Sequence, residues 1–349
     1  MIKLLFFTNG NSEIGMGHIF RSMALAEYLR FNFEIRFVLA NSSDLAFNMI
    51  RFNGYAVDHL PPNSDKSASI IALKHLLSVS SAIVSDSYNF DTEYQIELRK
   101  TGIKIVCIDD LAKFPFACDV IINHNPHIGE YDYKIIGKKP EFCLGLDYAL
   151  IRKDFLDERT KGKRPDHSIL ICIGGTDHIG FGIRLLTLIS KITIRPITVH
   201  YITTSSNIRL EEIAGKIESL NSERTEEVHL HVDQDAMQMR RLMLESSVIF
   251  STPSTVTLEA IACRLPVIAA ATAANQESLA MALANMNLIR YLGPTGEIRD
   301  EDILYEVSSF FTRHCDISDL LERQRTALDL KSPIRYVQTF QKLFTQEMK

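Results

Sequence analysis

The sequence Gly15-Met16-Gly17-His18-Ile19-Phe20-Arg21 follows an apolar run, Ile2 to Thr8, and leads into a second apolar segment, Met23 to Leu29. The first run has the length of a buried strand and the second has helical composition, so the glycines mark a strand-to-helix turn. Unpaired backbone N–H groups point outward at such a helix start and favour an anion, usually phosphate. His18 adds a side chain that can move a proton near neutral pH. The stretch therefore predicts phosphate binding combined with proton transfer.

A Gly-x-Gly sequence after a strand is also typical of dinucleotide-binding folds, but the pattern fails here. Phe20 stands at the third glycine position, and no clear acidic residue closes a second strand at the expected distance. Taken alone, His18 could also be a helix cap or a core residue. Its catalytic role therefore depends on the other motifs of the chain.

Composition indicates a globular protein of two domains, because 349 residues, 46% of them apolar, can bury two cores. The net charge of −5 argues against a nucleic-acid-binding surface. No apolar segment is long enough to span a membrane, and residues 1–8 lack the pattern of a signal peptide. We expect reduced, buried thiols in a cytoplasmic protein, without a zinc site, because the cysteines are scattered and mostly apolar in context. They are Cys107, Cys118, Cys143, Cys172, Cys263 and Cys315.

Strand-like and helix-like segments alternate along the chain, which predicts parallel, doubly wound α/β sheets. In the first half, strands are expected at residues 34–40, 82–86, 104–110 and 120–123, and helices at 43–53 and 92–100. In the second half, strands are expected at 168–173, 197–202, 228–232, 247–250 and 266–270.

A polar, basic stretch at residues 152–167 indicates a linker between an N-terminal domain, 1–151, and a C-terminal domain, 168–330. Residues 331–349 predict a final amphipathic helix that could pack back on the N-terminal domain. Its apolar side carries Tyr336, Phe340, Leu343 and Phe344.

Ligands of open α/β sheets bind beyond the carboxyl ends of the strands, so residues that follow strands are the candidates in the second half. Gly174 and Gly175 let the backbone approach a ligand closely, although a plain turn with Asp177 as a helix cap is an equally good interpretation. Asn275 and Gln276 follow a later strand and are candidates for sugar hydroxyls or acyl-amino groups.

The run Ser251-Thr252-Pro253-Ser254-Thr255 precedes the helix that contains Glu259. Hydroxyls and free N–H groups at this helix start, Ser254 and Thr255 among them, can hold a diphosphate. Glu259 lies about one turn further in, where its carboxylate could accept bonds from ribose hydroxyls. The alternative is an ordinary Ser/Thr cap with a solvated glutamate.

The whole set resembles the UDP-sugar hydrolases of pseudaminic acid biosynthesis, the UDP-2,4-diacetamido-2,4,6-trideoxy-beta-L-altropyranose hydrolase family. The resemblance starts with residues 15–21 and 24–26 and covers roughly residues 1–285. Its further motifs follow in order at residues 85–91, 108–111, 118–123, 145–152, 174–177 and 275–276.

This resemblance implies the glycosyltransferase-B (GT-B) architecture, two Rossmann-like doubly wound α/β domains that face a cleft. It implies hydrolysis of a UDP-linked diacetamido-trideoxyhexose to UDP and the free sugar, for pseudaminic-type acids of flagellin or cell-surface polysaccharide. His18 looks like the base that activates water, and Tyr88 and Asn275 like partners of the sugar and its surroundings. The other expected substrate or UDP residues are Gly15, Gly17, Arg21, Gly174, Gly175, Ser254, Thr255, Glu259 and Gln276. The resemblance implies no metal or redox cofactor and a UDP-sugar as ligand. Monomer or weak dimer is expected.

Three points stay open at the level of sequence. The turn at residues 251–255 lacks the glycine usual in the family, and Pro253 removes a backbone donor, so the sugar isomer can differ. Arg21 can pair with an acid, with phosphate or in a surface ion pair. The function could instead be that of a GT-B glycosyltransferase or a non-catalytic sugar-nucleotide-binding protein. A hydrolysing UDP-sugar 2-epimerase would need several acids, and Asp86, Asp109 and Asp110 could serve unless they are ordinary caps.

Overall fold

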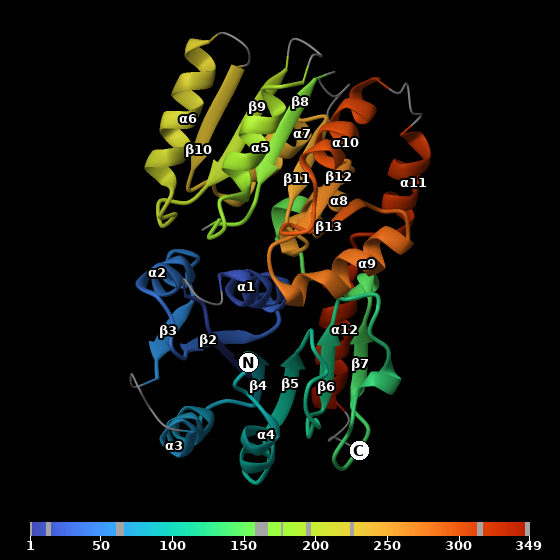
Figure 1. Cartoon of the computed structure of the whole chain (residues 1–349). Helices are drawn as coiled ribbons and strands as arrows, with labels where there is room; N and C mark the ends of the chain where they lie inside the picture. The colour runs from blue at the N-terminus through green and yellow to red at the C-terminus, as the bar shows by residue number, and fades with distance from the viewer. Residues whose placement is uncertain are drawn as a thin grey trace. The chain divides into compact units, whose positions relative to one another are not determined.

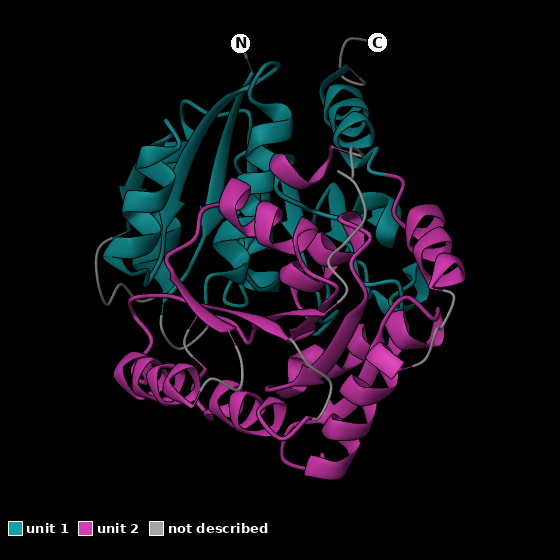
Figure 2. Cartoon of the chain, turned by 90° about the horizontal axis from the view of Figure 1, so that it is seen from above, with its two compact units in different colours: residues 1–153, 330–349 teal, residues 154–329 magenta. Residues whose placement is uncertain are grey.

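The computed structural model of the chain describes residues 2–11, 15–60, 66–157, 167–175, 177–192, 197–223, 227–312 and 317–345. The chain forms two compact units, which Figure 2 shows in teal and magenta. Unit 1 contains residues 1–153 and 330–349, and unit 2 contains residues 154–329. Residues 158–166 of the expected linker and 346–349 of the expected last helix lie outside the described residues.

Unit 1 is built on a parallel sheet of seven strands in the order β3-β2-β1-β4-β5-β6-β7 (Figure 1). The strands are β1 (Lys3–Thr8), β2 (Glu34–Leu39), β3 (Ala56–His59), β4 (Ala82–Asp86), β5 (Lys104–Ile108), β6 (Val120–Asn123) and β7 (Glu141–Leu144). The helices are α1 (Gly17–Leu29), α2 (Asp44–Phe52), α3 (Lys66–Leu77), α4 (Thr92–Arg99) and α12 (Ser332–Thr345). Short 3-10 turns occur at η1 (Glu130–Asp132) and η2 (Leu146–Tyr148). Central strands such as β1 have an apolar, buried middle, Leu4 to Phe7, because a parallel sheet is covered on both faces.

The last helix, α12, packs against α1 within unit 1. The ring of Tyr336 stacks on Tyr28 with 6.0 Å between centroids, and Phe340 meets Phe33 edge-on at the same distance. The hydroxyl of Tyr336 donates to the carbonyl oxygen of Tyr148 at 2.6 Å. Tyr336 and Phe340 are therefore core residues of unit 1, as the amphipathic pattern predicts.

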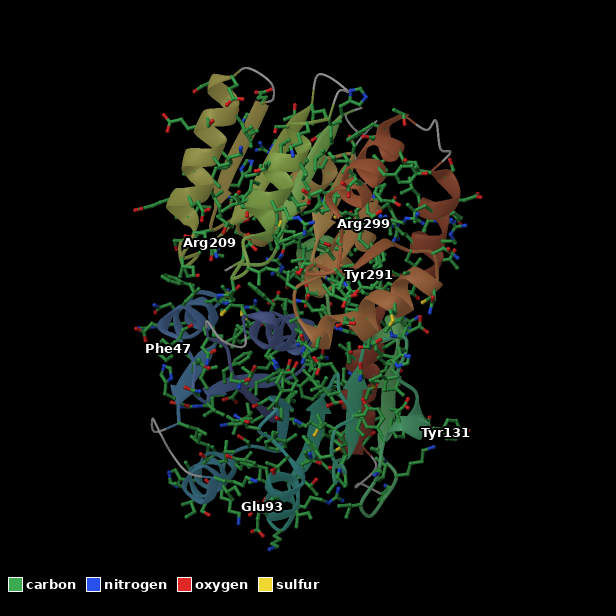
Figure 3. All side chains as sticks on the ribbon, viewed as in Figure 1. Phe47, Glu93, Tyr131, Arg209, Tyr291 and Arg299 are labelled. Atoms are coloured by element: carbon green, nitrogen blue, oxygen red, sulfur yellow. The ribbon has the colours of Figure 1, made fainter. Side chains whose placement is uncertain are left out.

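Unit 2 repeats the plan with a parallel sheet of six strands in the order β10-β9-β8-β11-β12-β13. Its strands are β8 (Ser168–Cys172), β9 (Thr198–Thr203), β10 (Glu227–Val232), β11 (Val248–Ser251), β12 (Val267–Ala271) and β13 (Arg290–Pro294). The helices are α5 (Phe181–Ile189), α6 (Leu210–Ser222), α7 (Ala236–Leu244), α8 (Thr255–Ala262), α9 (Glu277–Asn285), α10 (Asp300–Thr312) and α11 (Ser318–Ala327). The 3-10 turns are η3 (Lys153–Phe155), which starts at the end of unit 1, and η4 (Ala274–Gln276). Figure 3 labels Arg209, which immediately precedes α6.

Both sheets have a point where the strand order reverses, and such a point is where α/β sheets bind ligands. In unit 1 it lies between β1 and β4, whose last residues, Thr8 and Asp86, are paired in register. In unit 2 it lies between β8 and β11, where Cys172 is paired with Ser251. The loops and helix starts that follow these four strands carry most of the sequence-predicted site residues.

The expected doubly wound α/β fold is confirmed in both units, as are the strands and helices named from the sequence. The sequence reasoning missed the strands β3, β7 and β13 and the helices α3, α9, α10 and α11. Five cysteines are free and buried, as expected, and Cys315 lies outside the described residues. Within the described part of the chain, no helix combines the length and apolar character needed to cross a membrane.

Candidate active site

The glycine stretch of unit 1 turns the chain from β1 into α1. Gly15 has a φ of +77°, in the left-handed region that glycine adopts without strain. Helix α1 starts at Gly17, and its cap residue, Met16, makes no side-chain capping hydrogen bond. The second residue of the helix is His18, so the turn places an imidazole at the helix start, beside the reversal point of the sheet.

His18 is bound to Asp86, the last residue of β4. The Nδ1 atom of His18 lies 2.6 Å from Oδ1 of Asp86, and the two residues are 4% and 0% exposed. Because an aspartate only accepts hydrogen bonds, Nδ1 carries the proton and donates it. Nε2 then keeps a lone pair, and the carboxylate fixes both the tautomer and the ring orientation. Asp86 therefore holds His18 in the orientation and tautomer in which Nε2 can accept a proton.

Arg21 lies one turn further along α1 and binds the same carboxylate. Its Nε donates to Oδ2 of Asp86 at 2.7 Å and its Nη2 to Oδ1 at 2.8 Å, while Nη1 donates to Asp110 at 2.9 Å. Burial alone would raise the pKa of Asp86, but the charge of Arg21 and the bonds from His18 lower it below the ordinary value. Asp86 is thus held ionised. Arg21 is buried, so the interpretation as a surface ion pair is wrong, and its described contacts are carboxylates.

Tyr88 completes a ring of contacts around the histidine. Its hydroxyl donates to Oδ2 of Asp110 at 3.1 Å, the same oxygen that receives Arg21. Its ring stands edge-on to the imidazole, with 4.6 Å between centroids and 89° between planes. Tyr88 is 37% exposed, so it forms the solvent side of the cluster. The structure therefore brings together three of the residues named from the sequence, His18, Arg21 and Tyr88.

Asp109 differs from the other two acids considered for epimerase chemistry. Its carboxylate accepts bonds from the backbone N–H groups of Leu111 and Ala112 and from the hydroxyl of Tyr133. Burial raises its pKa above the ordinary value, and these donors only partly offset that effect. Asp109 is mainly a turn-stabilising acid, as the capping interpretation predicts.

Several buried polar atoms at this end of the sheet have no hydrogen-bond partner among the described residues. They are Thr8 Oγ1, Asn9 Oδ1, Ser85 Oγ and Asp110 Oδ1, at the ends of β1, β4 and β5. Buried polar atoms are nearly always paired in folded proteins, so such a group calls for an explanation by water or ligand. Their position at the reversal point favours a ligand.

In unit 2, Gly174 and Gly175 follow β8. Gly174 has a φ of +80°, and a side chain at Gly175 would come within 3.1 Å of Thr204. Asp177 accepts from the backbone N–H groups of Phe181 and Gly182, both at 2.9 Å, so its role as a cap of α5 is confirmed. Thr176 lies outside the described residues.

The helix start after β11 differs from an ordinary hydroxyl cap. Ser254 precedes α8 but makes no side-chain capping bond, and its Oγ donates back to the carbonyl oxygen of Thr252. Thr257 donates to the same oxygen at 2.9 Å, which fixes the turn around Pro253. Glu259 is 1% exposed, so the alternative of a solvated glutamate is wrong. Helix α8 therefore starts without a hydroxyl cap at Ser254, and the buried Glu259 lies about one turn further along it.

Asn275 and Gln276 lie on η4, directly after β12. The Oε1 atom of Gln276 accepts from the backbone N–H of Thr272 at 2.9 Å, so this side chain shapes its own loop. Asn275 is exposed. Both residues stay candidates for contact with a ligand.

Sequence reasoning did not include Asp86 and Asp110 among the site residues, although both bind Arg21. An available signal was an acid at the end of β4, the strand next to β1 in a doubly wound sheet. Among the described residues, no group of three or more His, Cys, Asp or Glu side chains is arranged to hold a metal ion.

Comparison with known proteins supports one family. The chain matches no protein-family model. It is 30% identical over 290 residues to the UDP-2,4-diacetamido-2,4,6-trideoxy-beta-L-altropyranose hydrolase of Campylobacter jejuni, over 81% of this chain and 96% of that protein. MurG of Acinetobacter baumannii has a TM-score of 0.69 at 12% identity, over 98% of this chain and 100% of that one. A glycosyltransferase of Rickettsia africae has a TM-score of 0.66 at 11% identity, over 100% of this chain and 99% of that one. These solved structures show that the fold is GT-B.

Proposed function

This chain belongs to the UDP-2,4-diacetamido-2,4,6-trideoxy-beta-L-altropyranose hydrolase family, and we propose that it hydrolyses a UDP-linked diacetamido-trideoxyhexose. It is an enzyme of GT-B fold that acts on a UDP-sugar. The products of the proposed reaction are UDP and the free sugar, the latter a precursor of pseudaminic-type nonulosonic acids for surface polysaccharide or flagellin. The observation that carries the proposal is the hydrogen bond from His18 Nδ1 to Asp86.

The proposed chemistry is attack of water on the anomeric carbon. Nε2 of His18 takes a proton from the water while its oxygen bonds to that carbon. The bond from the carbon to the diphosphate oxygen breaks, and its electron pair leaves with UDP. General-base catalysis of this kind is worth about 10²–10⁴-fold in rate. Asp86 stabilises the imidazolium that forms, as a carboxylate behind a catalytic histidine does.

The local charges support this role for His18. The buried cluster contains two carboxylates, Asp86 and Asp110, and one guanidinium, Arg21. A positive charge gained by His18 is therefore placed beside a group of residues with an excess of negative charge. Fixed charges that match the charge developing in the transition state are an effective catalytic contribution, because they need no reorganisation.

We propose that unit 2 holds the nucleotide. The N-terminus of α8 at Ser254 and Thr255 would receive phosphate oxygens, since the first N–H groups of a helix attract anions. Glu259 would accept hydrogen bonds from the ribose hydroxyls, and Gly174 and Gly175 would allow close approach of the nucleotide. Asn275 and Gln276 would contact the sugar. No cofactor takes part in the proposed reaction.

The main competing function is a glycosyltransferase, because the same base could activate an acceptor hydroxyl in place of water. An epimerase would need free acids near the sugar. Asp86 is bound to His18 and Arg21, and Asp109 to backbone N–H groups, so neither is free to act as an epimerase acid. Asp110 is bound to Arg21 and Tyr88 through Oδ2, and its Oδ1 has no partner among the described residues.

Incubation of the purified protein with the UDP-diacetamido sugar, without any acceptor, tests the proposal. Hydrolysis predicts equal amounts of UDP and free sugar with unchanged configuration at C2. Product that forms only after an acceptor is added indicates a transferase. A free sugar inverted at C2 indicates an epimerase.

A further inference from the structure

A cavity of about 150 Å³ opens into unit 1 beside His18. Exposed side chains, among them Tyr88, Leu111 and Lys113, line its mouth. All of its lining residues belong to unit 1, so the cavity is defined by this unit alone. The mechanism proposed above uses the histidine at its edge and leaves the cavity itself without a role.

The inner wall of the cavity is apolar. Phe90, Cys107 and Phe116 line it and are buried. Phe116 stacks on Phe114 with 4.8 Å between centroids, and Phe90 packs on Phe7 at 5.5 Å, so both rings are held firmly in the core. Such a surface gains free energy when it covers an apolar group and does not favour a hydroxyl or a charge.

Polar side chains interrupt this wall, because His18, Arg21 and Asp109 line the cavity together with Ser85. Ser85 lines the cavity, is 2% exposed, and its Oγ has no hydrogen-bond partner among the described residues. It precedes Asp86 on β4, and successive side chains of a strand point to opposite faces. Asp86 therefore serves His18 and Arg21 while Ser85 faces the core side of Phe7 and Cys107. A buried hydroxyl without a partner is rare in native proteins.

We propose that this cavity is the acyl subsite of the enzyme and takes one N-acetyl group of the sugar. This inference rests on the proposed function, because it concerns the substrate of the same site. The methyl group of the acetamide contacts Phe90 and Phe116. The Oγ of Ser85 is covered in this structure, and rotation of the Ser85 side chain toward the cavity lets it donate a hydrogen bond to the acetamide carbonyl oxygen. Ser85 is thus a specificity-determining residue.

Other groups of a deoxy sugar match the cavity less well. A C-methyl group would cover the aromatic wall but leave the Ser85 hydroxyl unpaired. A ring hydroxyl would pair with Ser85 but leave the apolar wall in contact with a polar atom, which costs free energy. An acetamide carries a methyl group and a hydrogen-bond acceptor two bonds apart, so this one group can contact the aromatic wall and pair with the Ser85 hydroxyl.

The test measures affinity in the His18→Ala background, so that binding is read without turnover. The probes are UDP, the UDP-2,4-diacetamido sugar, and two analogues in which a hydroxyl replaces the 2- or the 4-acetamido group. Ser85→Ala removes the hydroxyl, and Ser69→Ala is its control, a buried serine of α3 that does not line the cavity. Leu111→Trp narrows the mouth, and Ile96→Trp on α4 is its control, with almost the same exposure as Leu111.

We expect Ser85→Ala to weaken binding of the diacetamido nucleotide by about 3- to 10-fold, the effect of one hydrogen bond, while UDP binds as before. Leu111→Trp is expected to weaken it by about 10-fold or more, again without an effect on UDP. The affinity for one of the two analogues should change with neither substitution. The acetamido group that this analogue lacks is then the one that enters the cavity. The two control variants should bind every probe as the background does.

The subsite is overturned if both substitutions leave the diacetamido nucleotide unaffected, if they weaken UDP equally, or if both analogues stay as sensitive as the parent. Failure of the proposed function is a separate result. It would show as wild-type protein that binds the diacetamido nucleotide with the expected dependence on Ser85 but releases no free sugar.

Discussion

The imidazole of His18 and the carboxylate of Asp86 form a buried hydrogen bond of 2.6 Å across 68 residues of sequence. The bond exists because α1 starts beside β1, and β1 and β4 are neighbours at the reversal point of the sheet. The same carboxylate also accepts a hydrogen bond from Nε of Arg21. His18 as the proposed base, Asp86 as the acid that orients it, and Arg21, whose charge holds Asp86 ionised, are thus directly bonded to one another through Asp86.

Replacement of the proposed base tests its role. His18→Ala should lower kcat by about 10²–10⁴-fold, because the water loses its proton acceptor. Binding of UDP, measured by calorimetry, should be unchanged. His75→Ala, which removes an exposed histidine of α3, is the control and should keep full activity. Full activity of His18→Ala would exclude the base.

His18 and Asp86 should behave as one unit in a double-mutant cycle. Asp86→Asn loses the acid that sets the tautomer, so we expect a fall in kcat of about 10²–10⁴-fold, similar to that of His18→Ala. The double variant should then be little worse than either single variant, as is found for residues that act together. Multiplicative losses, measured by steady-state kinetics, would show that the two residues act independently.

Asp86 should also contribute stability in a pH-dependent way. Its folded pKa is lowered because the charge of Arg21 and the contacts of His18 outweigh burial. A carboxylate with a lowered folded pKa stabilises the protein above its unfolded pKa of about 3.9, and this contribution is lost as pH falls below that value. The Tm difference between wild type and Asp86→Asn should therefore be large at pH 7 and shrink toward pH 3. A difference that stays constant over this range would contradict the ion pair.

Tyr88 should act mainly through its position beside the imidazole. Tyr88→Phe keeps the ring but loses the bond to Asp110, which predicts a fall in kcat/KM of about 2- to 12-fold. Tyr88→Ala also removes the edge-on contact and should cost more. Tyr131→Phe, at a fully exposed tyrosine, is the control and should have no effect. Equal activity of Tyr88→Ala and wild type would remove Tyr88 from the site.

Glu259 tests the proposed nucleotide site. Glu259→Gln removes a buried carboxylate that would bind ribose hydroxyls, and hydrogen bonds to charged groups contribute about 1.5–3 kcal/mol. The Kd for UDP should therefore rise by roughly 10- to 100-fold. Glu301→Gln, at an exposed position of α10, is the control. An unchanged Kd for Glu259→Gln in calorimetry would place the nucleotide elsewhere.

The sequence predicts the central strands well because each contains an uninterrupted apolar run, as Leu4 to Phe7 in β1 and Ile169 to Cys172 in β8 show. It misses β3 and β7 because these are short edge strands of mixed polarity, Ala-Val-Asp-His and Glu-Phe-Cys-Leu. His18, Arg21 and Tyr88, which the sequence motifs single out, lie together in unit 1.

The hydrogen bond between His18 and Asp86 is harder to predict from the sequence, because it depends on which strands are neighbours in the sheet. The sequence places acids at the ends of several strands, and only the doubly wound strand order, with β4 next to β1, singles out Asp86 among them. Burial of Glu259 is likewise a tertiary effect, whereas the missing side-chain cap at Ser254 accompanies a local bond from its Oγ to the carbonyl oxygen of Thr252. Local propensity favours the opposite result in both cases.

Hydrolysis of the UDP-diacetamido sugar in ¹⁸O-labelled water, followed by mass spectrometry of both products, tests the central claim most directly. Attack by a water that His18 activates predicts the label at the anomeric hydroxyl of the free sugar and none in UDP. Label in the diphosphate of UDP would mean attack at phosphorus and would contradict the mechanism.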